Sequence, residues 1–328
     1  MDLLVLGGTE FVGRAVVKAA LERGWKVTVF HRGRHAAPEG ARVLTGDRTG
    51  GAAGLTALDE GRWDAVVDTW SAAPGAVRDT ARMLHGRTGA YAYVSSRSVY
   101  GYPTPAPLDE SAPVVGADGE DYAAVKRGGE VAAQRVYGDR ALLVRAGLIL
   151  GPDENVGRLP WWLGRIARGG EVLAPGPWEL PLQYIDARDL AGWTLDAVAA
   201  GLGGAYNVVS PPGHTTMGEL LEECVRATGS DAVLRWAPPE VVLGAGIEPW
   251  TQLPVWMPPG EDHETMHGGD VGKALGAGLV CRPVRDTVAD TWSWLSSLTS
   301  PPPHRPDRPP VGLPPELERE ALAALGAA

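Results

Sequence analysis

Short apolar runs alternate with amphipathic segments through the first half of the chain. The runs cover residues 3–6, 26–30, 42–44, 65–68 and 90–94, and residues 12–23 between the first two show helical spacing. Strand-type runs that alternate with helical segments are typical of a parallel sheet covered by helices on both faces. The pattern therefore predicts an α/β fold built on a doubly wound parallel sheet.

The second half of the chain continues this pattern only in part. Two further strands are expected at residues 141–150 and 205–209, with a helix at 189–200 between them. Residues 151–181 and the chain after 211 are instead interrupted by glycine, proline and tryptophan. We therefore expect a sheet domain made of residues 1–150 and about 183–210, and a smaller C-terminal substrate-binding lobe made of 151–182 and 211–299.

The last segment, residues 300–328, combines a proline-rich spacer with a predicted C-terminal helix. The spacer, 300–310, cannot continue a helix because proline lacks the backbone N–H and clashes with the preceding turn. Beyond it, Leu317, Ala321, Leu322 and Leu325 fall on one helical face. Both a helix docked on the lobe and a frayed tail are compatible with this pattern.

Composition narrows the class of protein. Of the 328 residues 44% are hydrophobic and 21% charged, and no apolar run is long enough to span a bilayer. The net charge of -10 opposes nucleic-acid binding, which depends on neutralising phosphates. The N-terminus reads as a buried strand rather than a signal peptide, so we expect a cytoplasmic protein. Cys224 and Cys281 are expected to be structural thiols, and no metal site is expected.

A glycine-rich turn follows the first predicted strand and precedes the first predicted helix. Gly7 and Gly8 let the backbone approach a pyrophosphate, Gly13 allows close helix packing, and the helix N-terminus supplies N–H groups. This context predicts a Rossmann dinucleotide-binding domain. The predicted cofactor-binding residues of the turn are Gly7, Gly8, Thr9, Glu10, Phe11, Val12 and Gly13.

The end of the second strand bears on the choice of cofactor. It is followed by His31, Arg32 and Arg34, where an acidic residue for the ribose 2'-hydroxyl is usual in NAD-binding proteins. Two arginines suit a 2'-phosphate, so NADP(H) is preferred and NAD(H) remains possible. By topology, the adenine is expected near Asp47 and Arg48, and the nicotinamide ribose near Thr69, Trp70 and Ser71.

Tyr122 and Lys126 form the predicted catalytic pair. They are four residues apart at the start of a helical run, so they share one helix face. Because the chain has only four lysines, their pairing by chance is improbable. A tyrosine with a pKa of about 10 needs a nearby cation to transfer protons near pH 7, and Lys126 supplies it. Ser96, at the carboxyl edge of the sheet, is expected to polarise a substrate carbonyl.

These motifs together resemble the extended or atypical short-chain dehydrogenase/reductases, including the NAD-dependent epimerase/dehydratase-like group. The resemblance runs through residues 1–295 and includes the segments 95–101, 144–147 and 183–191. It implies that Ser96 and Tyr122 hold the reacting oxygen, while Lys126 binds the nicotinamide ribose and tunes the tyrosine. Two positions depart from the family pattern. Glu10 replaces the usual middle glycine, and residues 146–150 lack the asparagine typical of nucleotide-sugar enzymes.

The substrate side is less well defined. Trp161 and Trp162 suggest an aromatic wall that suits a hydrophobic or planar molecule, although such residues equally fill lobe cores. The predicted substrate residues are Ser98, Arg158, Trp161, Trp162 and Gln183. His263 and His267 match a zinc-protease spacing, but neighbouring prolines and glycines leave too short a helix, and we expect a solvated loop there.

Three functions are compatible with the sequence. The preferred one is an NADPH-dependent oxidoreductase that reduces a carbonyl or imine of a small organic metabolite, with Tyr122 as the general acid. The second is an epimerase or dehydratase that retains NAD and acts on a sugar-type substrate. The third is a non-catalytic dinucleotide-binding or RNA-binding member of the atypical group. A homodimer is possible, with residues 122–136 as the candidate contact face.

Overall fold

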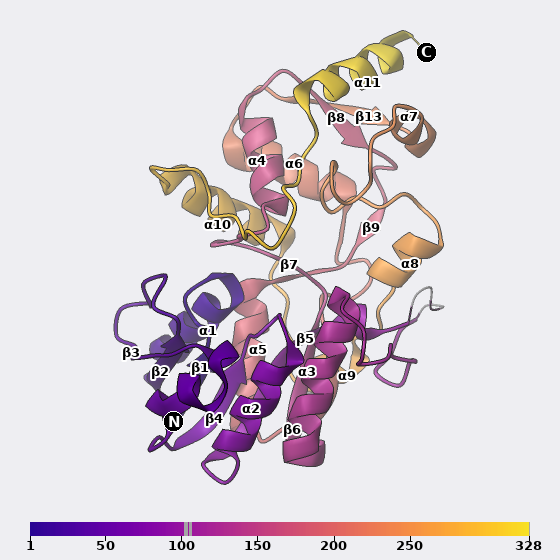
Figure 1. Ribbon diagram of the computed structural model, residues 1–328. Coiled ribbons are helices and arrows are strands. Elements are labelled where there is room, and N and C mark those ends of the chain that lie inside the picture. Colours follow the sequence, from indigo (N-terminus) through magenta and orange to yellow (C-terminus); the bar gives the residue numbers. More distant parts are fainter. Residues whose placement is uncertain (102–103, 105–106, 328) are drawn as a thin grey trace.

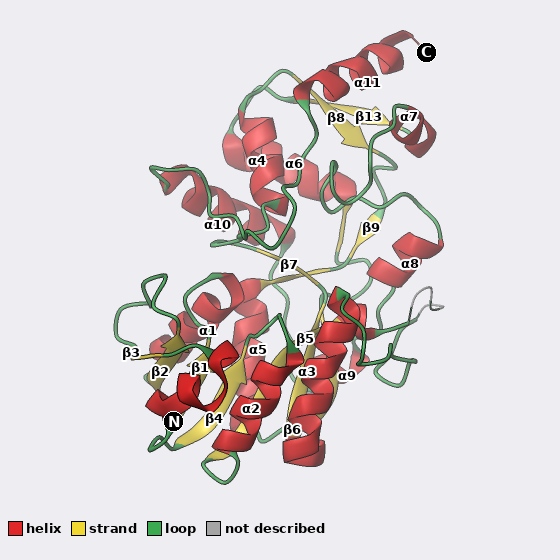
Figure 2. Ribbon diagram, viewed as in Figure 1, coloured by secondary structure: helices red, strands yellow, loops and turns green. Residues whose placement is uncertain are grey.

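The computed structural model contains one seven-stranded sheet with a smaller lobe above its carboxyl edge (Figure 1, Figure 2). It describes all residues except 102–103, 105–106 and 328. All strand pairs of the sheet are parallel, and the strand order is β11-β6-β5-β4-β1-β2-β3. The strands are β1 (Asp2–Leu6), β2 (Lys26–His31), β3 (Arg42–Thr45), β4 (Trp63–Asp68), β5 (Thr88–Ser96), β6 (Ala141–Ala146) and β11 (Gly204–Val208). The predicted doubly wound α/β fold is confirmed.

Helices cover both faces of the sheet, which explains why its central strands are apolar without alternation. Leu3 and Val5 of β1 pack with one hydrophobic cluster, whereas Leu4 and Leu6 pack with another on the opposite face. The first face carries α1 (Phe11–Glu22) and α5 (Ala187–Ala199), and the second carries α2 (Pro74–Leu84) and α3 (Tyr122–Tyr137). The 3₁₀ helix η1 (Arg48–Leu58) extends the second face, where Leu55 and Leu58 are buried.

The predicted single strand at 141–150 is two strands. After β6 the chain leaves the main sheet at Gly147, and β7 (Leu148–Leu150) pairs with β10 (Tyr184–Asp186). A Cβ atom at Gly147 would lie 2.4 Å from Val209 Cγ2, so the turn requires glycine. The continuous apolar run hid this break because both strands are buried. The divergence carries the chain from the sheet domain into the lobe.

The lobe has a hydrophobic core of its own, centred on the fully buried Trp162 and Trp256. Its helices are α4 (Arg158–Ala167), α6 (Met217–Thr228), α7 (Pro239–Gly244) and α10 (Val284–Ser297). Its strands are β8 (Glu171–Pro175), β9 (Pro181–Leu182), β12 (Thr215–Thr216) and β13 (Val233–Ala237). Two short helices return toward the sheet domain, α8 (Glu261–His267) and α9 (Gly272–Gly276). Ala274 of α9 packs in the core of the sheet domain.

The C-terminal helix α11 (Pro315–Ala327) docks on the lobe, so the frayed tail is excluded. Ala321 is buried in the lobe core, and Glu318 is buried against Arg165 of α4 with a shortest N–O distance of 2.7 Å. The proline-rich segment before α11 passes the junction of lobe and sheet domain (Figure 1). Among the described residues, no helix is long and apolar enough to cross a membrane.

Candidate active site

A cavity of about 910 Å3 lies at the carboxyl edge of the sheet, where the sheet domain meets the lobe. Ligands of open α/β sheets bind at this edge. The sheet domain contributes the ends of β1, β2, β4 and β5 and the start of α3, and the lobe contributes the loop after β7, Trp250 and α8. Four C-terminal residues complete the lining, namely Arg305, Pro306, Asp307 and Arg308.

The glycine turn has the form that a dinucleotide needs. Gly7 and Gly8 have φ angles of 113° and 85°, and a Cβ atom at Gly13 would lie 2.6 Å from the backbone nitrogen of Gly8. Glu10 is the N-cap residue of α1, but its side chain makes no capping hydrogen bond. The backbone N–H groups of the first helical turn are therefore not capped by this side chain. All seven predicted turn residues line the cavity. Bare N–H groups at a helix N-terminus suit the pyrophosphate of a dinucleotide.

His31, Arg32 and Arg34 line the cavity beside β2, as the sequence predicts, and both arginine residues are exposed. The buried Nε2 of His31 makes no hydrogen bond to any described residue. The pKa of His31 is lowered by burial and then by His35, so the ring is neutral near pH 7. Nε2 of the neutral His31 ring and the guanidinium groups of Arg32 and Arg34 can therefore bind a polar or anionic ligand at this end of the cavity.

Asp47, one of the two residues predicted near the adenine, caps the 3₁₀ helix η1, and its role toward the cofactor stays a prediction. Asp47 does not line the cavity, because its carboxylate accepts hydrogen bonds from the backbone and hydroxyl of Thr49 and caps η1. Arg48 does border the cavity, but its guanidinium is buried in a two-pronged pair with Asp68 at 2.6 and 2.7 Å. It therefore ties η1 to the end of β4.

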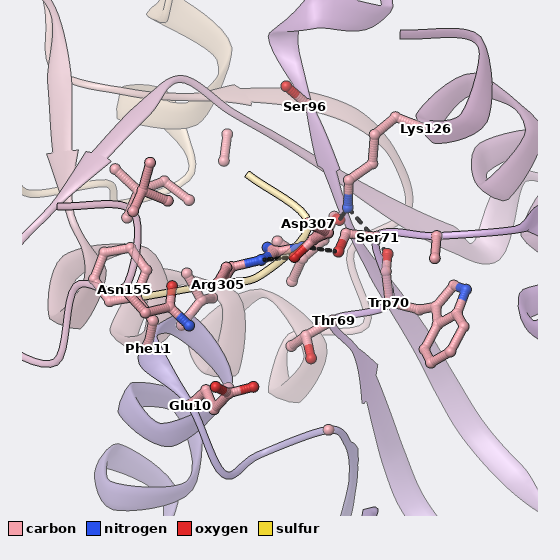
Figure 3. Close-up of a pocket in the computed structure, with 18 of the residues that line it drawn as sticks. Glu10, Phe11, Thr69, Trp70, Ser71, Ser96, Lys126, Asn155, Arg305 and Asp307 are labelled. Carbon is pink, nitrogen blue, oxygen red and sulfur yellow. Dashed lines mark hydrogen bonds and ion pairs between the residues drawn. The ribbon is translucent and has the colours of Figure 1, made fainter. Parts of the chain in front are cut away.

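Thr69, Trp70 and Ser71 follow β4 and line the cavity as predicted. The Thr69 hydroxyl donates to the carbonyl of Leu6, which ties the end of β4 to the glycine turn. The Ser71 hydroxyl accepts a hydrogen bond from Arg305, 3.0 Å away (Figure 3).

Ser96, Tyr122 and Lys126 line the same end of the cavity. Asp121 caps α3 through the backbone N–H of Ala124, which places Tyr122 in the first turn. A Cβ atom at Gly129 would lie 2.3 Å from the Tyr93 hydroxyl, so α3 packs unusually close to β5. This approach lets the buried Lys126 ammonium donate to the carbonyls of Val94 and Trp70 at 2.8 and 3.0 Å.

Strand alternation separates the two serines at the end of β5. Ser95 donates to the buried carboxylate of Glu130, which also pairs with Arg145 at 2.9 Å. Ser96 points to the other side and lies in the cavity, where its oxygen accepts from the backbone N–H of Ser98. The buried network behind the strand thus holds the position of Ser96.

The surroundings of Tyr122 favour its ionised form. Burial raises its pKa, but the Lys126 ammonium, the Ser96 hydroxyl and the Arg308 guanidinium outweigh burial, and the pKa is lowered overall. Arg308 lies over the tyrosine ring with its central carbon 4.3 Å from the ring centroid. The pKa of Lys126 is also lowered, chiefly by burial. Tyr122 is therefore more readily ionised than a free tyrosine, which suits a residue that exchanges protons.

Of the five predicted substrate residues, Ser98 and Arg158 line the cavity and three do not. Trp162 is fully buried in the lobe core, where its Nε1 donates to the carbonyl of Pro254. Trp161 packs against this core, and Gln183 is buried among hydrogen bonds to Arg97, Ser210 and Gly269. The predicted aromatic wall from these tryptophans is therefore wrong, because both residues pack in or against the lobe core.

The expected solvated loop at 261–267 is also wrong. These residues form α8, in which both histidines are buried; His263 contacts the carbonyl of Pro181, and Nδ1 of His267 accepts from the N–H of Gln183. Packing against the lobe stabilises a helix that is too short to form alone. Among the described residues, no group of three or more His, Cys, Asp or Glu is placed to hold a metal ion.

Several cavity residues were not predicted from the sequence. Asn155 is buried at the cavity wall, and the guanidinium of Arg158 beside it lies 5.3 Å from the Trp250 ring. Thr265 and Met266 of α8 contribute to the same wall. Arg305 and Arg308 come from the proline-rich spacer, whose composition gave no functional signal.

Comparison with known proteins places the fold. A model of the NAD dependent epimerase/dehydratase family matches residues 3–208. The chain is similar to the Bordetella bronchiseptica enzyme WbmH in complex with NAD+ (18% identity, 92% of this chain and 100% of that chain, TM-score 0.70). It is also similar to UDP-N-acetylglucosamine 4-epimerase from Bacillus cereus (16%, 93% and 100%, 0.69) and to UDP-glucose 4-epimerase from Thermus thermophilus (19%, 91% and 100%, 0.66). No curated protein matches significantly.

Proposed function

This chain belongs to the NAD-dependent epimerase/dehydratase family, and we propose that it is an enzyme that retains NAD and inverts a hydroxyl-bearing carbon of a sugar-type substrate. The observation that carries this proposal is that Ser96, Tyr122 and Lys126 lie close together and line the same cavity as the glycine turn. The family match favours this function over the NADPH-dependent reductase that the sequence alone preferred.

The three residues divide the proton chemistry. The Tyr122 oxygen accepts the proton of the substrate hydroxyl as that carbon is oxidised, and returns it when the carbonyl is reduced from the other face. Ser96 holds the reacting oxygen, and the buried Lys126 ammonium stabilises the phenolate. A nicotinamide held at this edge near Thr69, Trp70 and Ser71 would supply reversible hydride transfer. His31, Arg32 and the glycine turn would hold the adenosine and pyrophosphate portions.

Epimerisation is favoured over dehydration because of the acidic groups available. Loss of water from a ketone intermediate needs an additional acid and base near the reacting carbon. Among the described residues that line the cavity, the carboxylates are Glu10 at the glycine turn and Asp307, which is paired with Arg305. Neither lies on the strand end or helix that carries Ser96 and Tyr122.

The substrate side of the cavity favours an anionic sugar. Arg158 and Arg308 line the cavity near Tyr122, and neither guanidinium lies within 4.0 Å of a carboxylate in the described part of the chain, although Glu154 attracts Arg158 from farther away. Guanidinium groups without a carboxylate partner suit a phosphate or diphosphate group. The similar structures include UDP-sugar 4-epimerases, and one of them, WbmG from Bordetella bronchiseptica, was solved with NAD and UDP. A nucleotide-linked sugar is therefore the first substrate class to test.

The test is an epimerisation assay with a panel of UDP-sugars, followed by NMR of the sugar products. The purified chain is expected to interconvert a pair of epimers without added reductant and to release NAD on denaturation. Tyr122→Phe is expected to lower kcat about 100- to 10,000-fold, because the proton acceptor is removed. Tyr137→Phe is the matched control on the same helix, since its buried ring stacks on Tyr91 away from the cavity.

Two results would contradict the proposal. Stoichiometric consumption of NADPH with a simple carbonyl compound would restore the reductase hypothesis. Undiminished activity in Tyr122→Phe would show that the catalytic assignment is wrong.

A further inference from the structure

Residues 300–313, here called the C-terminal strap, form part of the lobe side of the cavity. We call this side the roof, and it also includes the loop after β7 and α8. The N–H of Arg305 donates to the carbonyl of Asn155 at 2.9 Å, and the N–H of Gly312 donates to the carbonyl of Thr251 at 2.8 Å. Leu313 is buried in the lobe core next to the docked helix α11. The strap is therefore held at its middle and at its end, and its turn at 305–308 faces the cavity.

Arg305 lies between Asn155 and Ser71 among the residues that line the cavity (Figure 3). Its Nη2 donates to the Ser71 hydroxyl at 3.0 Å, on the side predicted for the nicotinamide ribose. Nε and Nη2 also contact Asp307, but Nη1 makes no hydrogen bond to the described residues. Because Asp307 is 59% exposed, solvent weakens this pair, and an anionic ligand can compete for the guanidinium.

Glu10 explains why a cation is needed here. Glu10 stands at the start of α1 in the glycine turn, with its carboxylate 3.6 Å from Nε2 of His35, and this negative charge would repel a phosphate bound at the helix N-terminus. Burial lowers the pKa of Arg305, but Asp307 first, and then Tyr122 and Glu10, raise it overall, so the guanidinium stays charged. The strap thus brings a positive charge to the place where the turn carries an unfavourable negative one.

We propose that Arg305 is a cofactor-binding residue whose guanidinium pairs with the pyrophosphate of the bound dinucleotide, on the phosphate nearer to Ser71. The proposal rests on the dinucleotide cleft of the proposed function. The missing middle glycine is in this way compensated by a residue 295 positions later.

The experiment is calorimetric titration of the full-length chain, stripped of nucleotide, with NAD, ADP-ribose and AMP. Arg305→Ala is expected to weaken NAD and ADP-ribose binding about 10- to 100-fold, since one charge-assisted interaction is lost. AMP, which lacks the second phosphate, is expected to change less than about twofold. Arg305→Lys keeps the positive charge but loses the two-pronged guanidinium geometry. Its NAD affinity is expected to lie between those of the unmodified chain and Arg305→Ala. Arg319→Ala, on the exposed side of α11, is the matched control.

The outcomes separate this proposal from the proposed function. NAD binding that is unchanged or tighter in Arg305→Ala overturns the role of Arg305, the tighter case marking the strap as a self-inhibitory contact. If Arg305→Ala weakens AMP binding as much as NAD binding, the role of Arg305 is also overturned, because the substitution would then have loosened the whole roof. Tyr122→Phe is expected to bind NAD normally while losing activity. If the unmodified chain binds neither NAD nor ADP-ribose, both proposals fail together.

Discussion

The floor and the roof of the cavity are stabilised in different ways. The floor consists of strand ends, the glycine turn and the start of α3, and it is part of a seven-stranded ladder with apolar clusters on both faces. The roof consists of the loop after β7, α8 and the strap, and buried carboxyl groups such as those of Glu154 and Glu318 hold it to the lobe. The residues proposed to transfer protons thus lie on the backbone of the sheet domain, whereas the roof is held by a few ionisable contacts.

The largest loss of stability is expected when the ion pair that docks α11, the helix after the strap, is broken. In Glu318→Ala the buried Arg165 loses its carboxylate but keeps its contacts with the carbonyls of Gly169 and Glu171, while the N–H of Leu173 loses its acceptor. Breaking a buried ion pair from one side costs about 3–5 kcal/mol. Chemical denaturation is expected to show this loss, and hydrogen exchange is expected to accelerate along α11.

Glu316→Ala is the control for this comparison. Glu316 is 70% exposed on the same helix and pairs with Arg319 only at the surface, so its removal is expected to change the stability by less than about 0.5 kcal/mol. A Glu318→Ala variant as stable as the control would show that the docking of α11 does not depend on this ion pair.

The residues of the floor could be predicted from the sequence, whereas most residues of the roof could not. The glycine turn, Ser96 and the Tyr122 and Lys126 pair belong to local patterns, a strand followed by a turn and two residues one helical turn apart. Asn155 and Arg305 reach the cavity only through tertiary packing, 150 residues apart in the chain. Trp162 was assigned to the wrong surface because composition cannot distinguish a lobe core from a pocket wall. Residues 261–267 became helical for the same reason, since packing outweighed the flanking prolines and glycines.

The roof is expected to become less stable as the pH rises, because of Glu154. This fully buried carboxyl accepts from the N–H groups of Arg158 and Leu159, yet burial raises its pKa from 4.5 to about 7. The folded chain therefore binds more protons than the unfolded chain between these values. Its contribution to stability is complete below about pH 4.5 and is lost as the pH rises to 7, by about 3 kcal/mol in total.

Glu154→Gln isolates this contribution. The variant keeps an acceptor but cannot ionise, so its free energy of unfolding is expected to exceed that of the unmodified chain at pH 8 and to match it near pH 4.5. Glu179→Gln, an exposed position of the same lobe, is the control and should follow the unmodified chain. Parallel pH profiles for Glu154→Gln and the unmodified chain would argue against a raised pKa.

The smallest expected effect is on cofactor affinity and concerns Arg32 and Arg34 beside β2, the outer rim of the floor. The sequence at this rim favours NADP(H), whereas similar structures contain NAD. Arg32 is exposed beside β2, and any contact with a 2'-phosphate is screened by solvent. If NADP(H) binds through this arginine, Arg32→Ala should weaken NADPH binding about tenfold and leave NADH unchanged, a difference of about 1.4 kcal/mol in a calorimetric titration. Arg62→Ala, at the amino edge of the sheet, controls for the loss of charge. Equal affinities of the unmodified chain for the two cofactors, unaltered by the substitution, would instead mean that the rim arginines are solvated and do not distinguish NADP(H) from NAD(H).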